Sequence, residues 1–128
     1  MIVLDASVLI GYLETQDAHH ARAEDLLAAE IEDDFAASVV TLAEVLVAPA
    51  RSGRVAAVEA ALSDLEVAEL ALPSDAAREL AELRATSALK MPDCCVLLAA
   101  LSHGARLGTF DARLGTAAAE RGVTVLGG

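Results

Sequence analysis

The chain has few aromatic side chains and few cations. It contains one tyrosine, two phenylalanines and no tryptophan among 128 residues, so it lacks the aromatic platform on which single-stranded nucleic acids stack. Nine lysines and arginines stand against 20 aspartates and glutamates, which gives a formal net charge of −11. This balance argues against nonspecific nucleic-acid binding through a basic face. It favours binding of cations, binding of a basic partner, or simple solubility.

Long hydrophobic runs and a cysteine framework are also missing. No apolar run reaches the about 18 residues that a membrane-spanning helix needs, and the first segment, MIVLDASVLIGYL, has an acid at its fifth position and no basic residue. We therefore expect a cytoplasmic protein with neither a signal peptide nor an anchor. The only cysteines, Cys94 and Cys95, are adjacent, which predicts buried apolar side chains and neither a disulfide nor a zinc site.

The length and composition of the sequence instead predict one well-packed domain, residues 1–128. Hydrophobic residues make up 55% of it, and the mean hydropathy is +0.50. Short apolar runs alternate with segments of helical periodicity, and the runs predict strands within residues 2–4, 34–40, 66–72, 105–110 and 123–127. This alternation predicts an α/β fold: a mostly parallel sheet of about five short strands, the 66–72 strand at its edge, flanked on both faces by about seven helices.

Four acids occupy comparable places in this pattern. Asp5 follows the first strand, Glu44 is expected in the first turn of the helix after the second, and Asp93 and Asp111 begin two later helices. Each position alone suits an acid that caps a helix or complements its positive end. Because right-handed crossovers bring the carboxyl ends of parallel strands to one edge, we expect the four to meet there.

Four carboxylates at one edge would repel one another strongly unless protons or divalent cations intervene. Helix dipoles, each contributing at most about 1–2 kcal/mol, do not hold four anions together. Oxygen ligands without cysteine or histidine suit a hard ion such as Mg²⁺ or Mn²⁺. Such ions activate water and stabilise a leaving oxygen in phosphodiester hydrolysis, and they attract the phosphate that an acidic surface repels.

Glu44 is the single charged residue in the stretch AASVVTLAEVLVAPA, and it needs a partner there. Thr41 and Glu44 have the spacing of a capping box, in which the glutamate bonds to a backbone N–H at a helix start. The alternative partner is a bound cation. Both interpretations stay open, because a carboxylate has two oxygens.

Four segments carry a resemblance that covers essentially the whole chain: MIVLDASVLIGYL, SVVTLAEVL, LKMPDCCVLLAAL and LGTFDARL. In their order and spacing they resemble the PIN-domain nucleases, specifically the VapC-type toxins of bacterial toxin–antitoxin pairs. The resemblance implies a Mg²⁺- or Mn²⁺-dependent endoribonuclease that cleaves structured cellular RNA of the tRNA or rRNA class and so inhibits translation. It also implies a cognate VapB-type antitoxin that blocks the enzyme.

The resemblance also implies roles for individual residues. Asp5 and Asp93 match direct metal ligands, whereas Glu44 and Asp111 match acids that act through water or bind a second ion. The residues it implies are therefore four catalytic, metal-binding acids, Asp5, Glu44, Asp93 and Asp111, and two supporting hydroxyls, Ser7 and Thr109. In one departure, Leu114 stands where many relatives have an aromatic residue three positions after the fourth acid, and Phe110 precedes that acid instead.

Two other functions compete with this interpretation. In a phosphotransfer domain Asp5 would be the acceptor, but Ser7 stands where a haloacid-dehalogenase-type site needs a second aspartate. The only lysine, Lys90, comes too early for a receiver domain. The second alternative is a noncatalytic PIN-like module for binding or dimerisation.

Partners are expected in either case. The apolar first helices and VVTLAEVLVAP predict a homodimer and a hydrophobic groove for an antitoxin segment, whose arginine would pair with the acids. Four arginines are candidates for contacting RNA phosphates, although ordinary surface charge explains each of them better when taken singly: Arg51, Arg54, Arg84 and Arg113.

Overall fold

The computed structural model describes residues 1–128 and contains five strands and seven helices, as predicted. The strands are β1 (Ile2–Leu4), β2 (Phe35–Ser38), β3 (Ala68–Leu70), β4 (Arg106–Gly108) and β5 (Val125–Leu126). The helices are α1 (Ala6–Leu13), α2 (His20–Ala29), α3 (Val39–Arg51), α4 (Val55–Asp64), α5 (Ala76–Ala85), α6 (Met91–His103) and α7 (Ala112–Glu120). None of these helices is long and apolar enough to cross a membrane.

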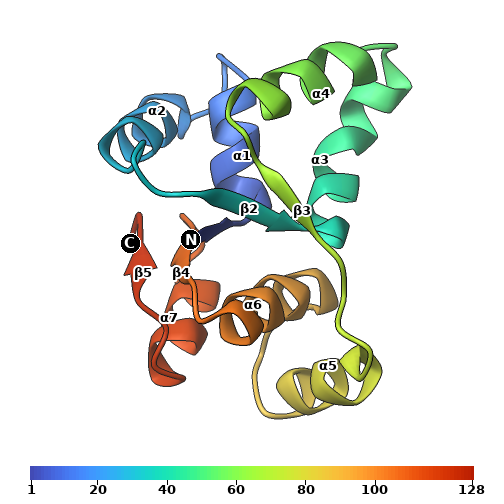
Figure 1. Ribbon diagram of the computed structural model, residues 1–128, viewed down its shortest axis with the longest axis vertical. Coiled ribbons are helices and arrows are strands. Elements are labelled where there is room, and N and C mark those ends of the chain that lie inside the picture. Colours follow the sequence, from blue (N-terminus) through green and yellow to red (C-terminus); the bar gives the residue numbers. More distant parts are fainter.

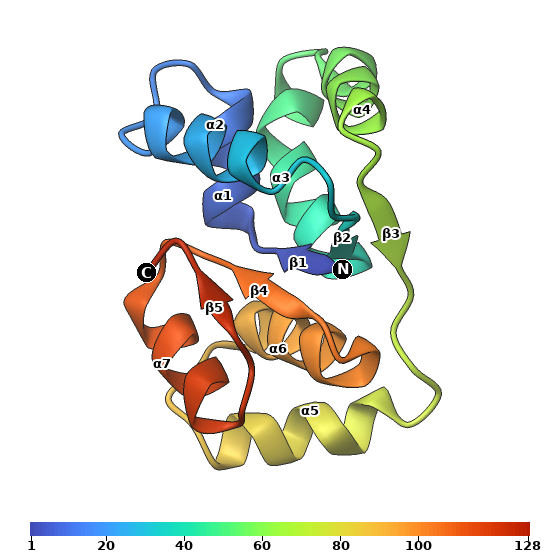
Figure 2. The same cartoon turned by 60° about the vertical axis from the view of Figure 1, so that its left-hand side comes forward.

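The five strands form one sheet in the order β3-β2-β1-β4-β5, and every neighbouring pair is parallel. The predicted α/β fold is therefore confirmed, with β3 at the predicted edge. Helices α1 to α4 cover one face of the sheet and α5 to α7 cover the other (Figures 1 and 2). Since all strands run the same way, their carboxyl ends share one edge, and the chain passes from that edge into α1, α3 and α7.

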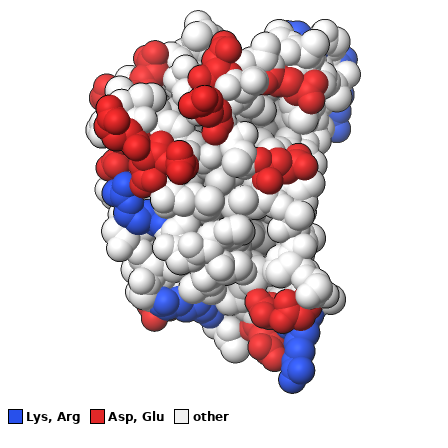
Figure 3. Space-filling view, in the orientation of Figure 1, with Lys and Arg blue, Asp and Glu red and all other residues white.

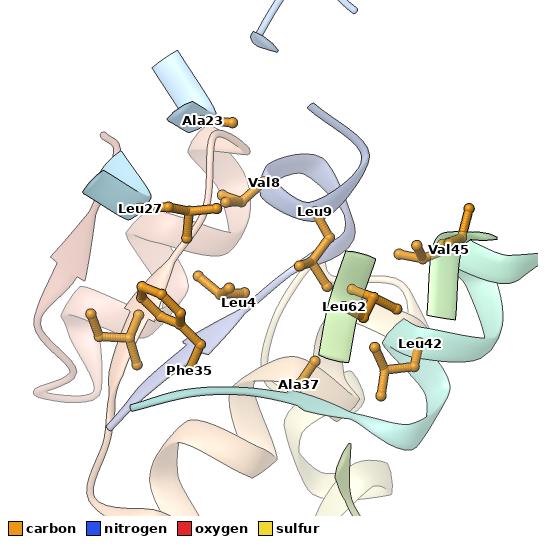
Figure 4. Packing of buried hydrophobic residues seen from close by; sticks show 12 residues of the cluster. Leu4, Val8, Leu9, Ala23, Leu27, Phe35, Ala37, Leu42, Val45 and Leu62 are labelled. Atoms are coloured by element: carbon orange, nitrogen blue, oxygen red, sulfur yellow. The ribbon is translucent and has the colours of Figure 1, made fainter. Parts of the chain in front are cut away.

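Two hydrophobic clusters, one on each face, hold the helices to the sheet. Alternate residues of β1 point to opposite faces, so Leu4 belongs to the first cluster and Val3 to the second. Figure 4 shows the first cluster, in which side chains from α1, α2, α3 and α4 pack over β1 and β2. Burial of each large apolar side chain contributes roughly 1.5–3 kcal/mol, so the central strand is firmly fixed in place. Cys94 and Cys95 are buried free thiols, as predicted.

Two predicted boundaries are wrong. The β-branched Val39 and Val40 were expected to continue the second strand, but they begin α3, because the Ser38 hydroxyl accepts a hydrogen bond from the N–H of Val40 at 3.3 Å and caps the helix. The helical periodicity of PSDAARELAELRATSAL predicts a helix that continues to Lys90, but this helix ends at Ala85. After it, the hydroxyls of Thr86 and Ser87 bond back to carbonyls of its last turn, and residues 86–90 form a loop.

Candidate active site

Asp5 follows the central strand directly and is only 4% exposed. It caps α1, as its position in the sequence suggested, because one carboxylate oxygen accepts the N–H of Val8 at 3.1 Å. The Ser7 hydroxyl donates to the same oxygen at 2.6 Å, and the Thr109 hydroxyl donates to the other at 2.5 Å. Burial raises the pKa of Asp5, whereas these three donors oppose the rise by stabilising the ionised form.

The two hydroxyls also connect Asp5 to the loop after β4. The Ser7 hydroxyl oxygen accepts the N–H of Phe110 at 3.0 Å, and that of Thr109 accepts the N–H of Asp111 at 3.0 Å. Ser7 and Thr109 are therefore both in direct contact with Asp5. Their contribution to catalysis stays a prediction.

Asp111 is the N-cap of α7 and is exposed to solvent. One of its carboxylate oxygens accepts the N–H groups of Arg113 and Leu114 at 2.9 and 3.1 Å. The Leu114 side chain is fully buried beneath this turn, so in this chain an aliphatic residue packs where many relatives have an aromatic one. The helix-cap explanation of Asp111 is correct, and it leaves the second oxygen without a protein donor.

Asp93 lies in the first turn of α6 and is partly exposed. Burial raises its pKa, and the charges of Asp111, Asp5 and Glu44 raise it further. Lys90, at the N-cap of the same helix, opposes this rise. The other three candidate acids therefore all lie near enough to Asp93 to act on its ionisation.

Glu44 does not lie in the helical turn that the sequence predicted. Because α3 begins at Val39, Glu44 lies in the second turn of the helix and not the first. Thr41, its expected capping-box partner, is inside the helix and fully buried, with no hydrogen-bond partner for its hydroxyl. Ser38 takes the capping position instead, so the capping box is wrong. Partial burial and the charge of Asp5 raise the pKa of Glu44.

The structure thus brings the four acids into one electrostatically coupled group at the carboxyl edge of the sheet. It does not bring them into a closed cage, because no three histidine, cysteine, aspartate or glutamate side chains converge closely enough to hold one metal ion between them. The group fits a hard cation in ligand chemistry and charge: its ligands are carboxylate oxygens, and Lys90 is the one protein cation that acts on their ionisation.

One cluster of side chains beside these acids, formed by Arg22, His19 and Phe110, is not predicted by the sequence. The Arg22 guanidinium lies 4.5 Å from the centre of the Phe110 ring and donates a 2.7 Å hydrogen bond to the carbonyl of Gly127. The His19 ring packs against the same phenylalanine at 4.9 Å. These contacts connect α2 and the end of the chain to the loop between Thr109 and Asp111. No local pattern indicates them, because the partners are far apart in the sequence.

Open parallel sheets bind ligands at the carboxyl ends of their strands, and in this chain that edge is acidic. The family model described as PIN domain matches residues 2–120. The chain therefore belongs to the PIN-domain family. Comparison with curated proteins gives no match.

Solved structures of toxin–antitoxin proteins are similar to this chain over nearly its whole length. A toxin–antitoxin complex from Klebsiella pneumoniae is 25% identical, with 90% of each chain covered and a TM-score of 0.74. VapC20 of Mycobacterium tuberculosis, described as a sarcin–ricin loop cleaving toxin, is 17% identical, with 91% of this chain and 95% of that chain covered and a TM-score of 0.74. VapBC2 of Rickettsia felis, bound to a DNA fragment from its promoter, is 14% identical, with 98% of each chain covered and a TM-score of 0.74. The predicted similarity to VapC-type PIN toxins is confirmed.

Proposed function

We propose that this protein is a divalent-metal-dependent endoribonuclease toxin that cleaves cellular RNA of the tRNA or rRNA class and so inhibits translation. The observation that carries the proposal is the coupling of Asp5, Glu44, Asp93 and Asp111 at the carboxyl edge of the sheet. Membership of the PIN family and the likeness to toxin–antitoxin structures support it. The similar M. tuberculosis protein is described as cleaving the sarcin–ricin loop, which favours an RNA substrate.

Asp5 and Asp93 are the proposed direct ligands of Mg²⁺ or Mn²⁺, and Glu44 and Asp111 act through water or on a second ion. Mg²⁺ normally keeps several water ligands, so a site in which no three side chains converge is compatible with it. When bound, the ion supplies Lewis-acid stabilisation of the leaving oxygen and lowers the pKa of water. The expected products carry a 5′-phosphate and a 3′-hydroxyl.

The chain's own contribution in this proposal is orientation and charge. Ser7 and Thr109 fix both oxygens of Asp5 and favour its ionised form, because hydrogen bonds to the charged carboxylate oppose the rise in pKa that burial causes. The same hydroxyls hold the backbone N–H groups of Phe110 and Asp111. Asp5 and Asp111 are therefore positioned as one unit.

A cognate VapB-type antitoxin and a second copy of the chain are the proposed protein partners, acting in the cytoplasm. The similarity to toxin–antitoxin complexes supports the antitoxin. Val47 on α3, within VVTLAEVLVAP, is 45% exposed and offers apolar surface for such a contact. An antitoxin arginine reaching the four acids would pair with them and inhibit the enzyme.

The test is incubation of antitoxin-free protein with total cellular RNA in Mg²⁺, Mn²⁺ or EDTA, followed by sequencing of the cleaved ends. The wild-type protein should produce discrete cuts that need metal. Asp5→Asn should abolish them, whereas Asp64→Asn, a matched change of an exposed acid at the end of α4, should leave them unchanged. Absence of cleavage, together with no stabilisation by Mn²⁺, would contradict the proposal and favour the noncatalytic binding module.

A further inference from the structure

The net charge of −11 is distributed very unevenly along the chain. Residues 1–83 contain four arginines and 17 acids, whereas residues 84–128 contain five cations and three acids. Two of those three acids are Asp93 and Asp111, so outside the candidate active site this part of the molecule is basic. Figure 3 shows most of the visible acidic side chains over the half of the molecule that α1 to α4 form.

A continuous groove leads from the candidate active site into this basic part. One hollow is bounded by Asp93, Asp111 and the end of the 86–90 loop, and a second lies between the same loop and the outer face of α7. The two hollows share Leu89 and Arg113 in their walls, so they form one groove. It begins at the acids and runs past Thr116 towards Glu120.

The side chains along this groove suit a phosphate backbone. Lys90 and Arg113 line its first part, both are exposed, and neither forms an ion pair with a carboxylate. Thr116 adds a hydroxyl group along the second part, whereas the hydroxyls of Thr86 and Ser87 already donate to backbone carbonyls of α5. Three arginines outside the groove form ion pairs: Arg54 with Glu14, Arg78 with Glu82, and Arg106 with Glu30 and Asp33.

We propose that this groove, which we call the α7 groove, binds the sugar–phosphate backbone of the RNA substrate, with Lys90 and Arg113 contacting phosphates next to the one that is cleaved. The inference rests on the proposed function and adds the path of the RNA. A polyanion is repelled by residues 1–83 and guided to the basic part of the surface. Two exposed, unpaired cations at the mouth of the acidic group place phosphates directly beside it.

The other hollow beside Asp111 fits RNA less well. It lies between α7 and the end of the chain and is lined by Arg22, Phe110 and Gly127. Its one cation is already engaged by the Phe110 ring and the Gly127 carbonyl. We therefore assign binding of the RNA backbone to the α7 groove and not to this hollow.

The test is the salt dependence of RNA binding, measured by fluorescence anisotropy with a labelled RNA hairpin in EDTA, where metal-dependent cleavage does not occur. The variants are Lys90→Gln, Arg113→Gln and the double variant. Arg78→Gln removes the same charge from a site on α5 outside the groove and is the matched control. The double variant should bind on the order of tenfold more weakly, and the slope of log K against log salt should fall by about one for each cation removed. Arg78→Gln should keep the wild-type slope.

The assignment would be overturned by an unchanged slope in the double variant, by an equal loss in Arg78→Gln, or by no RNA binding of the wild-type protein. Displacement of the RNA by a polyglutamate peptide at lower concentration than by unlabelled RNA would also overturn it and assign the groove to an acidic protein segment. Cleavage in Mg²⁺ is measured separately. Cleavage with unchanged binding in the double variant refutes the groove alone, whereas groove-dependent binding without cleavage refutes the nuclease alone.

Discussion

The acidic side chains at the two edges of the sheet have opposite electrostatic environments. At the amino edge, Arg106 contacts both Glu30 and Asp33 at 2.9 Å, and the N-terminal ammonium contacts Asp33 at 2.8 Å. The ammonium and Arg106 lower the pKa of Asp33 far below its ordinary range. At the carboxyl edge, burial and mutual repulsion raise the pKa of Asp5, Glu44 and Asp93.

The difference separates structural acids from candidate functional ones. Acids at the amino edge have protein cations within contact distance, so their charge is already compensated. Those at the carboxyl edge have hydrogen-bond donors and each other, with Lys90 as the single opposing cation. Ligands bind at the carboxyl edge of parallel sheets, and at this edge the carboxylates have few compensating protein charges. The charge of this edge therefore suits a cation from solution.

The largest expected effect comes from removing one carboxylate at each edge. Asp93→Asn should reduce RNA cleavage by at least about 100-fold, because even residues that only orient metal ligands cost 10- to 100-fold when changed. Asp33→Asn should retain cleavage but unfold at lower temperature, since it loses contacts with Arg106 and the N-terminus. Cleavage assays and thermal unfolding of both variants measure this. Equal loss of cleavage in both would remove the distinction between the edges.

The same two variants should also differ in how Mn²⁺ changes their melting temperature, which is measured without RNA. Millimolar Mn²⁺ should raise the melting temperature of the wild-type protein and of Asp33→Asn, because a ligand at 100 times its Kd stabilises the folded state by about 2.7 kcal/mol. Asp93→Asn should respond little or not at all. Differential scanning fluorimetry over a Mn²⁺ series reports this directly, and an undiminished response of Asp93→Asn would refute its role as a ligand.

The two edges should also respond oppositely to pH in the metal-free protein. Asp5, Glu44 and Asp93 have raised pKa values when folded, so the folded state binds more protons, and their unfavourable contribution grows as the pH rises above about 4. Asp33 has a lowered pKa, so its stabilising contribution is complete at neutral pH and is lost only as the pH falls below about 4.

The measurable consequence is a gain in melting temperature as the pH falls from 7 to about 4 in EDTA, before the Asp33 contacts are lost. Asp93→Asn should show a smaller gain than the wild-type protein, because one repelling carboxylate is absent. Saturating Mg²⁺ should reduce the gain, since the ion compensates the same charges. A gain of equal size in Asp93→Asn would show that the repulsion lies elsewhere on the acidic surface.

The sequence predicts much of this fold because local patterns and tertiary structure agree. The apolar run at residues 2–4 is a buried central strand, and Gly104, in a left-handed conformation, ends the helix that starts beside Pro92. Asp5, Asp93 and Asp111 also lie at the helix starts where they were expected. Parallel topology then determines that they share one edge.

The errors occur where two local signals compete or where contacts are distant. The two valines after Ser38 have strand propensity, but the Ser38 cap and the burial of Leu42 and Val45 draw them into α3, which moves Glu44 into the second turn. The pairing of Arg106 with Asp33 and the packing of Arg22 on Phe110 depend on tertiary structure, and no spacing in the sequence indicates them.

The smallest expected effect concerns Thr41, which the capping-box interpretation paired with Glu44. Its hydroxyl is buried without a partner in the first turn of α3, near the carboxyl edge of β2. Replacement by valine preserves the branched shape and removes the unpaired group, so Thr41→Val should stabilise the protein by about 1 kcal/mol and raise the melting temperature by roughly 3–5 °C. Ser38→Ala, which removes the actual cap, should destabilise it by about 1 kcal/mol. If Thr41→Val instead lowers both the melting temperature and the cleavage rate, the Thr41 hydroxyl supports the acidic group. The set of supporting hydroxyls then includes Thr41 of α3 as well as Ser7 and Thr109.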